Sequence, residues 1–206
     1  GISGLTAGIF AQKQGYNSII IEKHNEVGGN LTGWYRDGFY IDNCIHWLTG
    51  TNKKTKEYSL LKQIGVRDNF YFQENFFTVH LNNQSLSFNK NPEKTRLDML
   101  KISLEDSFEI NKFIDAVIGI TQLENLYGYN HNEKGTLIQK FTAIKRLLNY
   151  YNQSLNDLSN KFKHPLIKLA INGFIGGSFS SLGLLFSYAC FCENNGGIPY
   201  GGSKQM

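Results

Sequence analysis

The sequence predicts an α/β fold in which an incomplete Rossmann-like βαβ part precedes a region of hairpins and helices. Two glycines, Gly1 and Gly4, stand directly before a helix rich in small residues. A continuous β-branched run then covers residues 18–22, which is the pattern of a buried parallel strand. Near residue 75 the pattern changes, so we expect residues 1–75 to form an N-terminal nucleotide-binding part and residues 76–206 a second region.

The first helix is expected over residues 5–14, where Ala7, Gly8 and Ala11 would permit a close approach to a sheet. Gly15 follows as a stop signal. A helix, a short loop and the buried strand over residues 18–22 together predict the second half of a βαβ unit.

Two hairpins and one helix are expected after the glycine loop of residues 26–30. Asp37-Gly38 is a strong turn pair within residues 35–41. Apolar residues at helical spacing predict a helix over residues 56–64. Alternating apolar residues predict a second hairpin, over residues 77–81 and 86–88, with one buried face.

The rest of the chain predicts helices. Pro92 at the first helical position is a good helix start. Ser103-x-x-Asp106 and Ser154-x-x-Asp157 resemble capping boxes, with Asp where Glu is preferred.

One apolar stretch, residues 169–192, carries no charged residue and is long enough to span a bilayer. Asn172 and several Ser and Gly residues lower its hydrophobicity, so we expect one or two buried helices instead. Its aromatic and leucine side chains would line a lipophilic tunnel or pack in an ordinary core.

Composition excludes several classes of function. The net charge of +4 is spread along the chain, without the basic tract of a nucleic-acid binder. Three cysteines, Cys44, Cys190 and Cys192, form no disulfide or zinc pattern, so we expect no metal site and a cytoplasmic location. The chain opens on Gly1 without Met and ends at Met206, and we expect it to be a fragment.

Glu22, together with the glycines of the first turn, indicates a dinucleotide-binding site. It ends the expected strand at about the distance of a ribose-binding acid. Gly1 and Gly4 would let the backbone approach a pyrophosphate at the helix N-terminus, and we expect Gly4 to let the helix pack on the strand. A carboxylate at residue 22 would accept hydrogen bonds from ribose hydroxyls and repel a 2′-phosphate, which disfavours NADP.

The loop after Glu22 resembles the extended fingerprint of FAD-binding oxidoreductases, because a second glycine pair, Gly28-Gly29, follows the acid. Three further motifs resemble the family of phytoene desaturases, carotenoid isomerases and retinol saturases. They are Gly29-Asn30-Leu31-Thr32-Gly33-Trp34, Asp42-Asn43-Cys44-Ile45-His46-Trp47 and Gly196-Gly197-Ile198-Pro199-Tyr200-Gly201-Gly202-Ser203.

The resemblance implies non-covalent FAD and an apolar, polyene-like substrate whose carbon–carbon bonds are desaturated, saturated or isomerised. Residues 76–206, including the terminal glycine motif, would form the substrate region. It also implies that the first strand and the C-terminal segment completing the FAD site lie outside this chain, so we expect the chain alone to be inactive. The cofactor-binding residues would be Gly1, Ser3, Gly4, Glu22, Lys23, Gly28, Gly29, Asn30 and Thr32, with His46 a weak catalytic candidate.

Two other functions stay open. A flavin amine oxidase shares the N-terminal fingerprint, and a degenerate flavin fold would serve as a non-catalytic binding module. For any of these functions, NAD(P) stays open as a transient partner bound elsewhere. A basic cluster, Lys161, Lys163 and His164, precedes the apolar run and suggests peripheral contact with a membrane. The sequence does not predict the oligomeric state.

Overall fold

The computed structural model describes residues 1–121, 123 and 137–206, which divide into two compact units. Unit 1 comprises Gly1–Phe72 and Gly197–Met206, and unit 2 comprises Gln73–Gly196. The sequence prediction placed residues 197–206 in the second region, whereas the structure places them in the first. The chain therefore leaves unit 1 once and returns to it, so unit 2 is an insertion.

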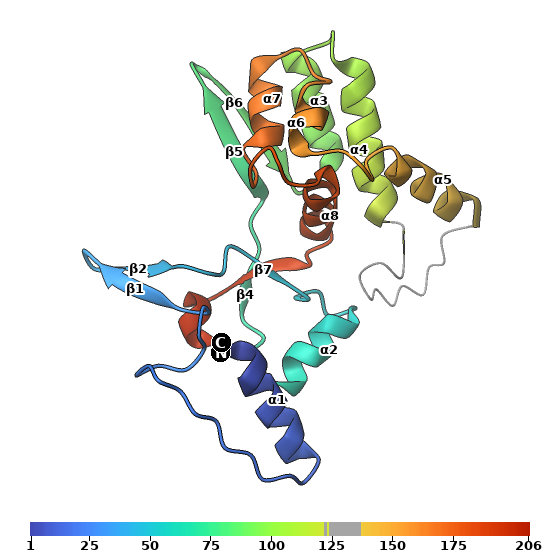
Figure 1. Ribbon diagram of the computed structural model, residues 1–206. Helices are drawn as coiled ribbons and strands as arrows, with labels where there is room; N and C mark the ends of the chain where they lie inside the picture. The colour runs from blue at the N-terminus through green and yellow to red at the C-terminus, as the bar shows by residue number, and fades with distance from the viewer. Residues whose placement is uncertain (122, 124–136) are drawn as a thin grey trace. The chain divides into compact units, whose positions relative to one another are not determined.

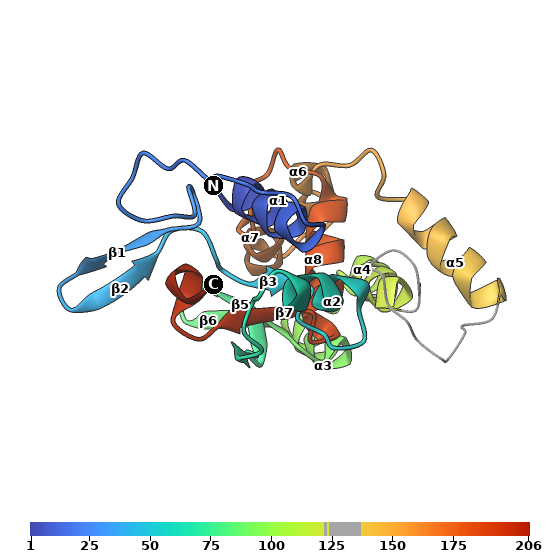
Figure 2. The ribbon, with the colours of Figure 1, turned by 90° about the horizontal axis from the view of Figure 1, so that it is seen from below.

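Unit 1 is a mixed α/β unit (Figure 1). Its elements are α1 (Ile2–Lys13), the hairpin β1 (Gly33–Arg36) and β2 (Phe39–Asp42), α2 (Lys56–Gln63), the sheet strands β3 (Leu48–Thr49), β7 (Gly196–Pro199) and β4 (Phe70–Tyr71), and the 3-10 turn η1 (Gly202–Gln205). Strand β7 is central in the three-stranded sheet and pairs antiparallel with β4. Both views show η1 beside the β1–β2 hairpin (Figures 1 and 2).

Local sequence signals explain these elements. Asp37 and Gly38 have φ angles of 51° and 82°, as the predicted turn between β1 and β2 requires. Thr55 caps α2 by accepting a hydrogen bond from the Tyr58 N–H at 3.1 Å. The predicted hairpin at 35–41 and the helix at 56–64 are therefore confirmed.

The prediction of a buried strand over residues 18–22 is wrong. The segment has no regular secondary structure and pairs with no strand of the described chain, and the Ile19 and Ile21 side chains are 91% and 92% exposed. A buried parallel strand needs neighbouring strands to cover its edges. The segment does pack on α1: a Cβ at Gly8 would lie 2.8 Å from Ile20 Cδ1. Helix α1 thus approaches this segment at Gly8 and not at Gly4, where an added Cβ would have no neighbour within 4 Å.

Unit 2 combines the predicted second hairpin with helices. The hairpin is β5 (Asn75–Leu81) and β6 (Gln84–Asn89), and the helices are α3 (Pro92–Ile102), α4 (Ser107–Thr121), α5 (Leu137–Leu148), α6 (Leu155–Ser159), α7 (Pro165–Asn172) and α8 (Ser181–Cys192). Helix α4 packs against α3, α5 and α8, and α7 packs on the hairpin. The core is contiguous and contains Ile110, Phe113 and Ile114 of α4.

Helix boundaries in unit 2 follow the predicted caps in two of three places. Asn91 accepts a hydrogen bond from the Glu93 N–H at 3.0 Å before Pro92, and Ser154 and Asp157 form a reciprocal capping box. Ser103 instead ends α3. The Asp106 carboxylate accepts hydrogen bonds from the N–H groups of Lys163 and His164, so the capping box predicted at Ser103 and Asp106 is wrong.

The apolar run of residues 169–192 folds into the end of α7, a loop and α8, as the prediction of buried helices requires. Leu184, Leu185 and Tyr188 are fully buried in the core, and Phe174 and Phe186 pack against it. In the described part of the chain, none of the helices has the length and apolar character that a bilayer crossing requires.

Candidate functional site

The predicted cofactor residues meet where the glycine loop touches the start of α1. A Cβ added at Gly29 would lie 2.8 Å from the Gly1 Cα, and the φ angles of Gly28 and Gly29 are 126° and 66°. Both loop glycines are therefore in the left-handed or related region that other residues avoid. The close approach joins the loop of residues 26–30 to the helix N-terminus.

The first turn of α1 has backbone donors to offer. Gly1 is the N-cap and no side chain caps the helix. The N–H groups of the first turn have no intrahelical acceptor, and the helix dipole adds positive potential there. Gly1, Ser3 and Gly4 thus contribute backbone and not side chains, which suits a pyrophosphate.

Glu22 lies beside this helix end. Its Oε1 accepts hydrogen bonds from the N–H groups of Lys23 at 2.9 Å and His24 at 3.2 Å, and its Oε2 lies 3.9 Å from the Gly1 nitrogen. The hydrogen bond from the His24 backbone is the main reason that the pKa of Glu22 is lowered. The carboxylate is therefore charged at neutral pH and oriented, as a ribose acceptor should be.

A pocket of about 650 Å³, the hairpin pocket, opens next to the glycine loop. Gly29, Asn30 and Thr32 of the predicted set line it. Gly1, Ser3, Gly4, Glu22, Lys23 and Gly28 are not among the lining residues, although Gly1 touches Gly29. The remaining lining residues are His24, Asn25, Glu26, Val27, Gly33, Trp34, Tyr35, Tyr40 and Lys204. The volume lies within the usual range of small-molecule sites.

Sequence reasoning missed Lys204 as a site residue. Its Nζ lies 5.2 Å from the centroid of the Tyr35 ring, within cation–π distance, and the side chain lines the hairpin pocket. It adds a positive charge to a pocket that otherwise has mainly polar and aromatic walls. No local motif marks Lys204, because its place depends on a contact between the two ends of the chain.

Asp42 makes that contact. Its Oδ2 accepts the Ser203 N–H at 2.5 Å, and its Oδ1 accepts the N–H groups of Cys44 and Ile45 at 2.9 Å. Tyr40 adds a 3.3 Å hydrogen bond between its hydroxyl and the Ser203 Oγ. Burial tends to raise the pKa of Asp42, but these backbone donors outweigh it and the pKa is lowered. Asp42 is therefore a positioning residue.

The structure does not bring His46 into the hairpin pocket. Its side chain is exposed, and its ring centroid lies 6.5 Å from that of Trp47. Across the described ranges 1–121, 123 and 137–206, no three His, Cys, Asp or Glu side chains gather as a metal site would require.

The helix N-terminus, the oriented acid and the tight glycine contact define a dinucleotide-binding domain of the Rossmann type. Comparison with protein families agrees: residues 1–64 match the model described as an NAD(P)-binding Rossmann-like domain. The matched segment contains every predicted cofactor residue and His46. At this level the protein carries a generic NAD(P)- or FAD-binding domain of the oxidoreductase kind.

Proposed function

We propose that unit 1 binds FAD and that the protein is an oxidoreductase acting on carbon–carbon bonds of an apolar, polyene-like substrate. The cofactor part is carried by one observation, the backbone contact of Gly1 with Gly29 at the uncapped N-terminus of α1. A side chain at Gly29 would fill the place where backbone donors can approach a pyrophosphate. The residues present therefore fit a dinucleotide.

Each residue has a distinct role in this proposal. The first-turn N–H groups of α1 hold the pyrophosphate, and Glu22 accepts hydrogen bonds from ribose hydroxyls. Thr32 and Asn30 offer polar groups within the hairpin pocket, and Lys204 compensates negative charge. Bound FAD supplies the hydride chemistry, and the protein orients it and excludes water.

The choice of FAD over NAD(P) rests on the second glycine pair and its resemblance to the flavin fingerprint. Glu22 further disfavours a 2′-phosphate. Isothermal titration of the protein with FAD, NAD⁺ and NADP⁺ tests this choice. We expect FAD to bind at least about tenfold more tightly than either nicotinamide nucleotide. Equal or tighter NAD⁺ binding would instead indicate a plain NAD site.

The polyene substrate rests on the resemblance of the three motifs. The last of them, residues 196–203, includes Ser203, which Asp42 binds beside the hairpin pocket. Anaerobic mixing of FAD-loaded protein with a polyene, followed by the flavin absorbance, tests the substrate. Reduction by amines with peroxide release in air would support the amine oxidase. Tight FAD binding with neither reaction would support the binding module.

Peripheral membrane contact belongs to the same proposal, because an apolar substrate would enter from lipid. Lys163 forms an ion pair with Glu105, which reduces the net positive charge available to lipid. Lys161 donates to the neutral Gln153 Oε1 at 2.7 Å and keeps its charge. Flotation with anionic liposomes at low salt tests this contact. We expect a weak, salt-sensitive association, and protein that stays unbound would remove it from the proposal.

A further inference from the structure

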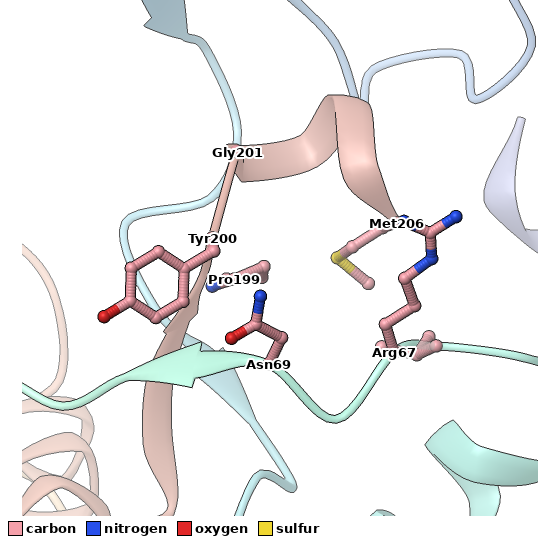
Figure 3. Close-up of a pocket in the computed structure, with 7 residues that line it drawn as sticks. Arg67, Asn69, Pro199, Tyr200, Gly201 and Met206 are labelled. Atoms are coloured by element: carbon pink, nitrogen blue, oxygen red, sulfur yellow. The ribbon is translucent and has the colours of Figure 1, made fainter.

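A second pocket, the Arg67 pocket, lies in unit 1 between residues 66–69 and the segment 199–206, with a volume of about 310 Å³ (Figure 3). Backbone pairing holds its two walls together. Phe70 is paired with Pro199 in the β4–β7 register, and the Tyr200 N–H donates to the Asn69 carbonyl oxygen at 3.1 Å. The pocket is therefore a product of the sheet.

The positively charged group of this pocket is the Arg67 guanidinium. No described side chain forms an ion pair with Arg67. The neighbouring Asp68 is engaged elsewhere, because its Oδ2 accepts the Tyr58 hydroxyl at 2.7 Å and lies 3.0 Å from the Lys53 Nζ. The guanidinium donors thus remain open to a ligand.

The other lining groups restrict the ligand further. The Asn69 carboxamide lines the pocket, and only its backbone oxygen is used in the bond to Tyr200. Figure 3 shows Arg67 beside Met206 on one side and Asn69 with Pro199 and Tyr200 on the other. The Tyr200 ring packs edge-on to Tyr71, with centroids 6.3 Å apart. Two polar donors thus face apolar walls.

We propose that the Arg67 pocket binds a small organic carboxylate with a compact apolar body. The planar guanidinium of Arg67 pairs with both carboxylate oxygens, and the Asn69 amide donates a further hydrogen bond. The body of the ligand contacts Pro199, Met206 and the Tyr200 ring. The volume suits a ligand of about the size of benzoate. This site shares no residue with the hairpin pocket and does not depend on the proposed function.

Calorimetric titration with benzoate and with its neutral isostere benzyl alcohol tests the site. We expect benzoate to bind about tenfold more tightly than benzyl alcohol, and Arg67→Ala to weaken benzoate about tenfold or more. Arg36→Ala is the matched control, because Arg36 is an exposed arginine of the same unit outside this pocket. It should bind benzoate as the unchanged protein does.

Asn69→Asp provides a second variant that keeps the backbone bond to Tyr200. The introduced carboxylate should repel benzoate and weaken it at least about tenfold, while circular dichroism stays unchanged. Equal benzoate affinity in Arg67→Ala, or no benzoate binding by the unchanged protein, would overturn the proposal. Inorganic phosphate binding as tightly as benzoate would overturn the requirement for an apolar body.

Discussion

The Asp42 carboxylate accepts the backbone N–H of Ser203 at 2.5 Å and so joins segments 161 positions apart. A Cβ at Gly202 would lie 2.3 Å from the same carboxylate oxygen, which shows how closely the two backbones approach. The contact places Lys204 on Tyr35 at the hairpin pocket. The cofactor unit is therefore built from both ends of the chain.

Asp42→Asn should destabilise unit 1 by about 1–3 kcal/mol, because the amide cannot accept all three backbone donors. Both tryptophans, Trp34 and Trp47, lie in unit 1, so their fluorescence during urea unfolding reports on this unit. Asp37→Asn is the control, since Asp37 is exposed and only pairs weakly with Arg36. An equal loss in both variants would contradict the role of Asp42.

The same contact predicts a pH dependence. The folded pKa of Asp42 lies below its ordinary value of 3.8. Its contribution to stability is therefore complete above pH 3.8 and is lost as the pH falls through the lower folded pKa. The stability difference between the unchanged protein and Asp42→Asn should shrink in acid unfolding measurements below about pH 4.

Gly29→Ala should weaken FAD or ADP binding by at least about tenfold, because the added Cβ meets the Gly1 Cα. Its positive φ adds about 1–2 kcal/mol of backbone strain. Gly38→Ala has the same left-handed strain with nothing within 4 Å of the added Cβ, so it should lose stability but bind normally. Calorimetry of both variants separates the two effects, and normal binding by Gly29→Ala would count against the site.

Glu22→Gln should weaken 5′-ADP binding about five- to tenfold, because glutamine lacks the charge that favours ribose hydroxyls. It should also narrow the preference for 5′-ADP over 2′,5′-ADP, since the repulsion of a 2′-phosphate is removed. Competition titrations with both nucleotides measure this preference. An unchanged ratio would remove Glu22 from the ribose site.

Lys204→Ala should weaken FAD binding in a salt-dependent way. The loss should be largest at low ionic strength and should shrink in high salt, as expected for an exposed charge. Lys54→Ala is the control because Lys54 is an exposed lysine of unit 1 outside the hairpin pocket. A loss of equal size in both variants would indicate only an effect of net charge.

Tyr188→Phe tests the core of unit 2. The buried Tyr188 hydroxyl donates to the Asn89 carbonyl at 2.7 Å and lies 2.6 Å from the Thr95 Oγ1. Its removal leaves buried polar groups unpaired and should cost about 1–3 kcal/mol in urea unfolding followed by circular dichroism. Exposed Tyr151→Phe should change stability by less than about 0.5 kcal/mol. A neutral Tyr188→Phe would show that its aromatic packing alone matters.

Features decided by neighbouring residues were predictable from the sequence. The Asp37-Gly38 turn, the Pro92 helix start and the Ser154 capping box depend only on local backbone chemistry. Contacts between distant residues were not predictable in the same way. Residues 18–22 would be buried only with partner strands beside them. The Asp106 carboxylate accepts hydrogen bonds from the N–H groups of Lys163 and His164, which are distant in the sequence, and not from the start of a helix.

The candidate site likewise contains residues that the local sequence predicts and residues that depend on contacts between distant segments. The glycines and Glu22 belong to one continuous fingerprint, so the sequence predicts a shared role for them. The structure brings Gly1, Gly29 and Glu22 close together. Asp42 and Lys204 act through a contact that no spacing rule contains, and a basic residue in a terminal turn has no distinguishing signal. The Arg67 pocket likewise exists only because β4 pairs with β7.

Unit 2 is inserted into unit 1 directly after an antiparallel pair of strands, in which Phe70 pairs with Pro199 and Tyr71 with Ile198. Paired residues in such a ladder lie about 5 Å apart, so the chain leaves unit 1 at Phe72 and returns to it at the adjacent Gly197. A short turn, or an unrelated insert with adjacent termini, could connect these two residues without changing the register of β7. Unit 1 could therefore accept different inserts, and chimeras with exchanged inserts would test whether it keeps its fold without unit 2.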